Sequence, residues 1–266
     1  MIPLRFSAFL SLFLAGAVSA QTITIVIKDG DVAGVGSFVT AIDNLAVNSS
    51  GVWMVETSTT NGLSTMFRNG TPLLIESDAL PLPVGTTISS FDDLTINEAG
   101  TSGWNFFLAG LTTSTDSGVF VDSTLVLQES AISIAPQLSA GTPYIGFFGT
   151  KWNDARQLLV LANVDDLAIS STVDRALVRF QLNPANGLVS ETVLIEEGDS
   201  LPSFATETSE DLQTSPFAFA MNSIGGVLYT ADMTGATTAN VAIVVDSGAG
   251  PVVIAREGDA ECKAAH

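Results

Sequence analysis

Two short signatures alternate along the 266 residues of this chain, and this alternation limits its fold more than any other feature. The first signature is a run of β-forming residues that ends in an acidic turn. Its copies are IVIKDGD, LLIESD, LVLQES, VLIEEGD and VVIAREGD, which end at Asp31, Asp78, Ser130, Asp199 and Asp259. The second is an Asn between two apolar segments, usually with Gly three positions later, and it occurs at Asn48, Asn97, Asn153 and Asn222. Units that recur in this way bury their apolar faces against one another, so the chain is expected to stack similar units.

The Asn signature predicts a β-hairpin. An Asn side chain hydrogen-bonds the backbone just after it, and the following Gly accepts the left-handed conformation that closes a short loop. Arg156 replaces Gly in the third copy, so a differently shaped turn is expected there. In the second unit, apolar segments separated by turn residues predict four strands, at 93–97, 104–111, 118–121 and 124–128. Four short strands in one unit are typical of a propeller blade.

We therefore predict an all-β fold of tandem four-stranded antiparallel units, arranged like the blades of a β-propeller. Four units are expected at 45–78, 92–130, 146–199 and 216–259, within one domain over 21–259. The ring of blades is either incomplete or closed by an N-terminal strand at 22–28, and an open stack of β-sheets is the alternative. The last residues, 260–266, are expected to be a disordered tail.

The N-terminal residues predict export. Arg5 precedes an apolar run at 6–18, and the small residues Val18, Ser19 and Ala20 follow it, which is the order found in a signal peptide over 1–20. The run is shorter than the ~20 residues that span a bilayer, and no second span is expected. The mature chain would begin at Gln21 and be secreted or held at the cell surface.

Charge and residue usage exclude several functions. Loss of Arg5 with the signal peptide leaves eight of nine basic residues against 28 acidic ones, a formal net charge of −20. That charge repels nucleic acid, which is therefore not expected as a partner. A protein or a carbohydrate is the expected partner. The only histidine is His266 and the only cysteine is Cys262. Catalysis by Ser-His-Asp or Cys-His groups and multi-histidine metal sites are therefore not expected.

Carboxylates are the remaining candidates for chemistry. Calcium is the only cofactor that the sequence suggests, at turns that place two acids around a Gly: Asp29, Asp31, Glu197, Asp199, Glu257 and Asp259. Because calcium takes about six to eight oxygen ligands, other loops would have to contribute. The alternative is that these acids only end a strand and turn the chain. The adjacent pairs Asp92/Asp93, Asp165/Asp166 and Glu196/Glu197 are candidates for carboxylate catalysis, or for solvated turns.

The Asn and Gly pairs Asn48/Gly51, Asn97/Gly100 and Asn222/Gly225, followed by the aromatic residues Trp53, Phe106 and Tyr229, resemble a group of exported bacterial tandem-repeat proteins. These proteins are common in planctomycetes and marine bacteria, are largely uncharacterised and look propeller-like. The resemblance covers 21–259 and implies no known activity. Its members often end in an anchoring segment, which this sequence does not show.

Three functional hypotheses follow. The first is a non-enzymatic extracellular or cell-surface repeat module that binds an unknown ligand or serves as a scaffold. The second is a glycoside hydrolase that uses carboxylates in a propeller cleft. The third is a truncated fragment of a larger repeat protein.

Overall fold

The computed structural model describes residues 24–34, 36–169, 174–202, 204, 206–215, 218–235 and 240–259. Over these residues the chain forms eighteen β-strands and no helix, which confirms the predicted all-β class. The predicted signal peptide at 1–20 and the predicted tail at 260–266 lie outside the described residues. In the described part, no helical segment has the length and apolar character needed to cross a membrane.

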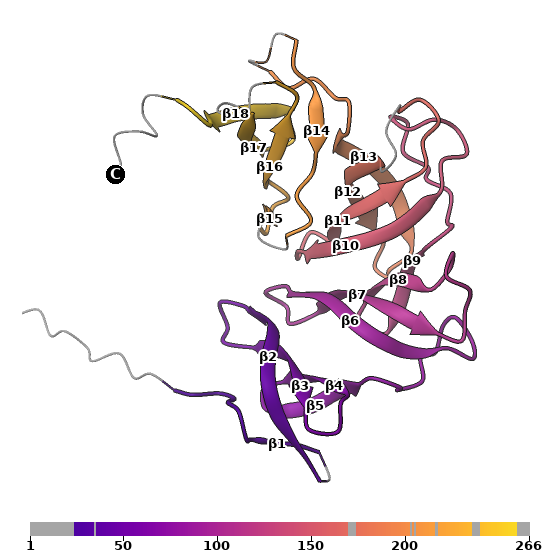
Figure 1. The fold of residues 1–266 in the computed structure, drawn as a ribbon, viewed down its shortest axis with the longest axis vertical. Helices are drawn as coiled ribbons and strands as arrows, with labels where there is room; N and C mark the ends of the chain where they lie inside the picture. The colour runs from indigo at the N-terminus through magenta and orange to yellow at the C-terminus, as the bar shows by residue number, and fades with distance from the viewer. Residues whose placement is uncertain are drawn as a thin grey trace, which may run out of the picture.

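Four antiparallel sheets follow one another along the chain (Figure 1). The first contains β1 (Val32–Gly34), β2 (Ser37–Val47), β3 (Trp53–Thr59), β4 (Ser64–Arg68) and β5 (Thr71–Ile75). The second contains β6 (Thr87–Ile96), β7 (Ser102–Ala109), β8 (Ser117–Val121) and β9 (Thr124–Gln128). The third contains β10 (Tyr144–Trp152), β11 (Gln157–Val164), β12 (Asp174–Leu182) and β13 (Leu188–Glu196). The fourth contains β14 (Ser209–Asp211), β15 (Phe219–Met221), β16 (Val227–Met233), β17 (Val241–Asp246) and β18 (Pro251–Arg256), with both β14 and β15 paired to β16.

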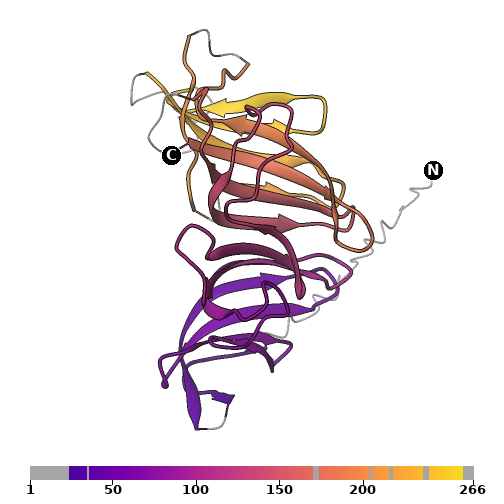
Figure 2. The same cartoon turned by 90° about the vertical axis from the view of Figure 1, so that its right-hand side faces the viewer.

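The sheets are arranged as an open arc of propeller-like blades. Strand β2 contacts β6, β6 contacts β10, and β10 contacts β15, so the early strands of successive sheets lie side by side. Figures 1 and 2 show the first sheet, in indigo, and the fourth, in orange to yellow, at opposite ends of the arc. One apolar cluster fills each of the three junctions between neighbouring sheets. The tandem antiparallel units predicted from the sequence are therefore present, with four strands in the second and third sheets and five in the first and fourth.

The Asn signature forms the same hairpin loop in all four sheets. The side-chain oxygens of Asn48, Asn97, Asn153 and Asn222 accept hydrogen bonds from the backbone amide four residues later, at 2.7 to 3.0 Å. The expectation of a different loop at Arg156 was wrong. Arg156 adopts a left-handed conformation with φ 60°, close to the φ 78° of Gly51. Its Nε donates to the Asn183 carbonyl at 2.8 Å, and its guanidinium lies 5.7 Å from the centre of the Trp152 ring.

The acidic signature forms a turn that joins one sheet to the next. In each copy the fourth turn residue donates its amide to the first residue's carbonyl, at 2.9 to 3.1 Å, and the third residue has positive φ. After each of the first three sheets, the turn pairs with the first strand of the following sheet. Gly198 donates to the Ser209 carbonyl at 2.8 Å, and Ser209 donates to the Asp199 carbonyl at 2.7 Å. Equivalent bonds join Ser77–Asp78 to Ile88 and Ser130–Ala131 to Tyr144. The turns after β5, β9, β13 and β18 end a strand, whereas the turn at Asp29 and Asp31 follows residues 24–28, which form no strand although one was predicted at 22–28.

Candidate functional site

The predicted pair Asp92 and Asp93 holds the sheets together. Asp93 is buried on β6, and its Oδ2 accepts hydrogen bonds from the Lys151 Nζ at 3.0 Å and from the Thr150 amide at 2.8 Å. The Lys151 Nζ also lies 5.0 Å from the centre of the Phe219 ring on β15. Asp93 and Lys151 therefore connect the second, third and fourth sheets. Asp92 accepts a hydrogen bond from the Asn105 amide on the neighbouring strand β7.

Glu56 is a second buried carboxyl near Asp92 and was not among the residues expected to matter. Asn44 Nδ2 donates both to Glu56 Oε2, at 3.0 Å, and to the Asp92 carbonyl, at 2.8 Å. Burial raises the pKa of Glu56 to about 7 despite the hydrogen bond from Asn44, and the charges of Asp43 and Asp92 add to the rise. Burial also raises the pKa of Asp92 to about 6. A charged residue in the apolar strand VWMVE was the sequence signal that could have identified Glu56.

The six acids predicted as calcium ligands lie in three separate turns on different parts of the arc. In each turn the last Asp accepts a hydrogen bond from the backbone amide three residues earlier: Asp31 at 2.9 Å, Asp199 at 3.0 Å and Asp259 at 2.9 Å. Asp29 and Glu257 are exposed. Within the described residues, no three His, Cys, Asp or Glu side chains form a group that could hold a metal ion. Calcium binding at these turns stays a prediction.

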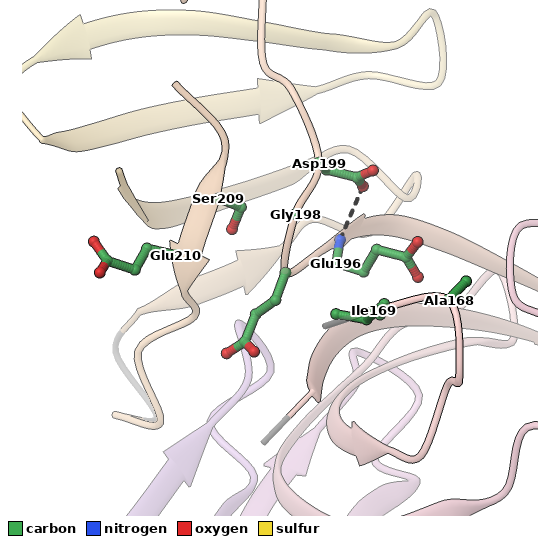
Figure 3. Close-up of a pocket in the computed structure, with 8 residues that line it drawn as sticks. Ala168, Ile169, Glu196, Gly198, Asp199, Ser209 and Glu210 are labelled. Carbon is green, nitrogen blue, oxygen red and sulfur yellow. Dashed lines mark hydrogen bonds between the residues drawn. The ribbon is translucent and has the colours of Figure 1, made fainter. Parts of the chain in front are cut away.

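A hollow lies where the third sheet meets the fourth, and we call it the acidic pocket. It has a volume of about 480 Å³ and is lined by Ala168, Ile169, Glu196, Glu197, Gly198, Asp199, Ser209 and Glu210. Figure 3 shows Glu210 on one side of the turn at Gly198, with Glu196 and Ile169 on the other. Two predicted residues, Glu197 and Asp199, thus take part in the site, together with the predicted pair partner Glu196.

Local structure fixes each wall of the acidic pocket. Glu196 is the last residue of β13, and the junction turn carries Glu197 to Asp199 across to Ser209 and Glu210 on β14. Asp166 shapes the opposite loop, where its carboxylate accepts amide hydrogen bonds from Ser139 at 2.6 Å and Ala168 at 2.9 Å. Burial opposes ionisation of Asp166, but these hydrogen bonds outweigh it and lower its pKa. The predicted pair partner Asp165 instead donates its amide to the Pro143 carbonyl.

The carboxyl of Glu196 has a strongly perturbed pKa. Burial raises the pKa of Glu196 to about 7, and the negative charges of Asp199, Asp166 and Asp174 raise it further. Burial also raises the pKa of Asp199, against the hydrogen bond from the Glu196 amide. Near neutral pH, Glu196 therefore exists both as a hydrogen-bond donor and as an acceptor, beside carboxylates that only accept.

Two buried polar atoms at the acidic pocket have no hydrogen-bond partner among the described residues: Glu196 Oε2 and Ser209 Oγ. Buried polar atoms are nearly always hydrogen-bonded, and these two belong to residues that line the hollow. Sequence reasoning missed Ser209, Glu210 and Ile169. These residues reach the pocket only through tertiary structure, where β14 approaches the end of β13. No local sequence pattern predicts this approach.

Comparisons with known proteins identify a family but no activity. No curated protein is significantly similar to the chain in sequence. Among solved structures, the chain is similar to the crystal structure of a protein of unknown function from Bacteroides caccae, at 11% identity, 88% coverage of this chain and 92% of the other. Their TM-score is 0.26, which does not establish a common fold. Residues 12–261 match the sequence family described as "Family of unknown function (DUF7453)". Because the match extends over nearly the whole sequence, the chain belongs to this family of unknown function.

Proposed function

We propose that this chain is an exported, non-enzymatic binding module that acts outside the cytoplasm or at the cell surface, and that it holds a polyhydroxylated ligand such as a carbohydrate in the acidic pocket. The observation that carries the proposal is the pair of unpartnered buried atoms, Glu196 Oε2 and Ser209 Oγ, at a hollow of about 480 Å³. Ligand sites are typically hollows of this size with a few convergent polar groups.

The chemistry of the acidic pocket favours hydroxyl groups. The carboxylates of Glu197, Asp199 and Glu210 accept hydrogen bonds, and the Ser209 hydroxyl both donates and accepts them. Ile169 and Ala168 add an apolar wall against which the C–H face of a sugar ring can pack. The formal net charge of −19 disfavours anionic ligands such as nucleic acids. The signal-peptide pattern of residues 1–20 supports export.

A carboxylate-dependent glycoside hydrolase is the second candidate, and the raised pKa of Glu196 favours it. A carboxyl with a pKa of about 7 is partly protonated at neutral pH, as a general acid must be. Asp199, three residues later at the same pocket, would then be the second carboxyl.

Binding to a panel of soluble polysaccharides, measured by isothermal titration calorimetry on the purified chain, tests the proposal. We expect at least one polysaccharide to bind, and Glu196→Gln and Ser209→Val each to weaken that binding by about tenfold, since each removes a group left for the ligand. Asp29→Asn is the matched control, because it removes one exposed carboxylate from an equivalent turn elsewhere.

The same samples separate the two candidate functions. Equal affinities for the wild type and the two pocket variants, or no binding to any polysaccharide, would overturn the proposed pocket. Release of reducing ends by the wild type, lost in Glu196→Gln and kept in Asp29→Asn, would establish the hydrolase instead.

A further inference from the structure

Each sheet of the arc has two faces, and we name them by their neighbours. The leading face is turned toward the preceding sheet, and the trailing face toward the following one. The residue six positions after each signature Asn lies on the trailing face: Met54, Gly103, Leu159 and Leu228. The first three are covered by the next sheet. Met54 and Leu159 belong to junction clusters, and a Cβ added to Gly103 would lie 2.8 Å from the Trp152 Cβ.

The fourth sheet leaves this trailing position open. Leu228 is 42% exposed, whereas Met54 and Leu159 are both 0% exposed. The next strand repeats the difference, because Ile243 is 38% exposed while its counterparts Met66, Val119 and Leu177 are at most 2% exposed. The fourth sheet therefore carries the apolar residues of a junction, but no fifth sheet among the described residues covers them.

The first sheet shows the converse on its leading face. In the second and third sheets, apolar residues one or three positions before the signature Asn are buried: Ile96 and Leu94 pack against the first sheet, and Trp152 belongs to the cluster between the second and third. Their counterparts on β2, Val47 and Leu45, are 63% and 70% exposed. Farther out on the same sheet, Ile27 of the N-terminal segment packs against the cluster of Ala33, Val39 and Phe67. The exposed part of this leading face is thus the portion of β2 that carries Leu45 and Val47.

From these two open faces we infer that copies of this chain associate head to tail, with the leading face of one copy's first sheet docked on the trailing face of another copy's fourth sheet. Every junction inside the chain joins a trailing face to a leading face and buries residues at these same positions. The open trailing face of the fourth sheet therefore needs a leading face to cover it, and the first sheet of another copy has one exposed. An interface between two different faces is heterologous, and it builds either a closed ring or an open series of copies.

Sedimentation velocity on the full chain in reducing buffer, so that Cys262 cannot link copies, tests the inference. We expect association that grows with protein concentration. Val47→Asp on the leading face and Leu228→Asp on the trailing face should each weaken it by at least about tenfold, because each buries a charge in an apolar interface. Val189→Asp, on β13 of the third sheet, is the matched control, since Val189 is 57% exposed but lies on neither open face.

Mixing the two variants is the decisive measurement. A head-to-tail interface predicts that an equimolar mixture forms dimers although neither variant associates alone, because the intact trailing face of Val47→Asp fits the intact leading face of Leu228→Asp. No recovery in the mixture would overturn the inference and indicate a face that pairs with itself. A wild type that stays monomeric at every concentration would also overturn it. Unchanged circular dichroism and melting of each variant show that folding is not the cause.

Discussion

At the scale of single residues, burial rather than sequence position decides which carboxyls have unusual chemistry. Glu196 and Glu56 both have a pKa raised to about 7, and burial is the largest cause in each case. Glu56 was not predicted, because its burial depends on the approach of the second sheet to the first. Glu196 was predicted only as half of an adjacent pair. Its neighbours Asp174 and Ser209 come from other strands, which no local pattern could indicate.

Glu56→Gln is expected to stabilise the protein above neutral pH. The folded pKa of Glu56, about 7, lies above its ordinary value of 4.5, so the folded state holds a proton that the unfolded state releases between these two pH values. The contribution of Glu56 is fully favourable below about pH 4.5 and is lost as the pH rises through about 7. Gln keeps the oxygen that accepts from Asn44 and cannot ionise. At pH 8 we expect a gain on the order of 2 kcal/mol in the free energy of unfolding.

Urea denaturation between pH 4 and pH 8 measures this effect, with the exposed Glu210→Gln as the control. The wild type and Glu56→Gln should have nearly equal free energies of unfolding at pH 4, and the variant should become the more stable of the two as the pH rises. A variant that loses stability equally at every pH would show that the Glu56 carboxyl contributes through its contacts and not through its ionisation.

At the scale of elements, the two signatures predicted the hairpins and junction turns correctly because both depend on local backbone chemistry. The Asn loops form as expected at Asn48, Asn97 and Asn222. The loop at Arg156 was expected to differ but has the same form, and the Arg156 side chain contacts a carbonyl and an aromatic ring. Strand limits were predicted less well. The expected strand at 93–97 is part of β6, which begins at Thr87. Register shifts between Ile88 and Ser90 and between Phe91 and Asp93 interrupt the apolar alternation. For this reason the first half of β6 was not predicted as a strand.

Asp78→Ala is expected to weaken the junction between the first and second sheets. Asp78 Oδ2 accepts a hydrogen bond from the Ile75 amide at 2.8 Å, which closes the turn. Its loss should cost about 1 kcal/mol of unfolding free energy, measured by urea denaturation. Asp78→Asn keeps an oxygen that can accept the same bond and should retain most of the stability. If both variants lose the same amount, the charge of Asp78 and not its hydrogen bond holds the turn.

At the scale of the whole molecule, the four sheets and their order were predictable, but the arc was not. The sequence left three possibilities open: an incomplete ring, a ring closed by the strand at 22–28, and an open stack. Residues that cover a junction and residues that are left at an open end have the same apolar character, as Ile96 and Val47 illustrate. Only the placement of the sheets in space distinguishes them.

The overall charge predicts how salt affects association. Each copy has a formal net charge of −19, so two copies repel one another, while the open faces are apolar. Raising the salt from about 0.01 M to about 0.1 M shortens the Debye length from about 30 Å to about 10 Å and screens this repulsion. We therefore expect association in sedimentation experiments to strengthen with salt. Weakening with salt would point to ion pairs instead of the apolar faces.

The bonds that join neighbouring sheets do not depend on the number of residues in each repeat. Successive signature Asn residues are 49, 56 and 69 positions apart, yet each described turn after β5, β9 and β13 bonds the next sheet through the same pair of backbone groups. Extra residues therefore lengthen loops and strands, while the backbone bonds that join one sheet to the next stay the same. A chain built this way can gain or lose loop segments, and with them binding specificity, while the bonds between its sheets are kept.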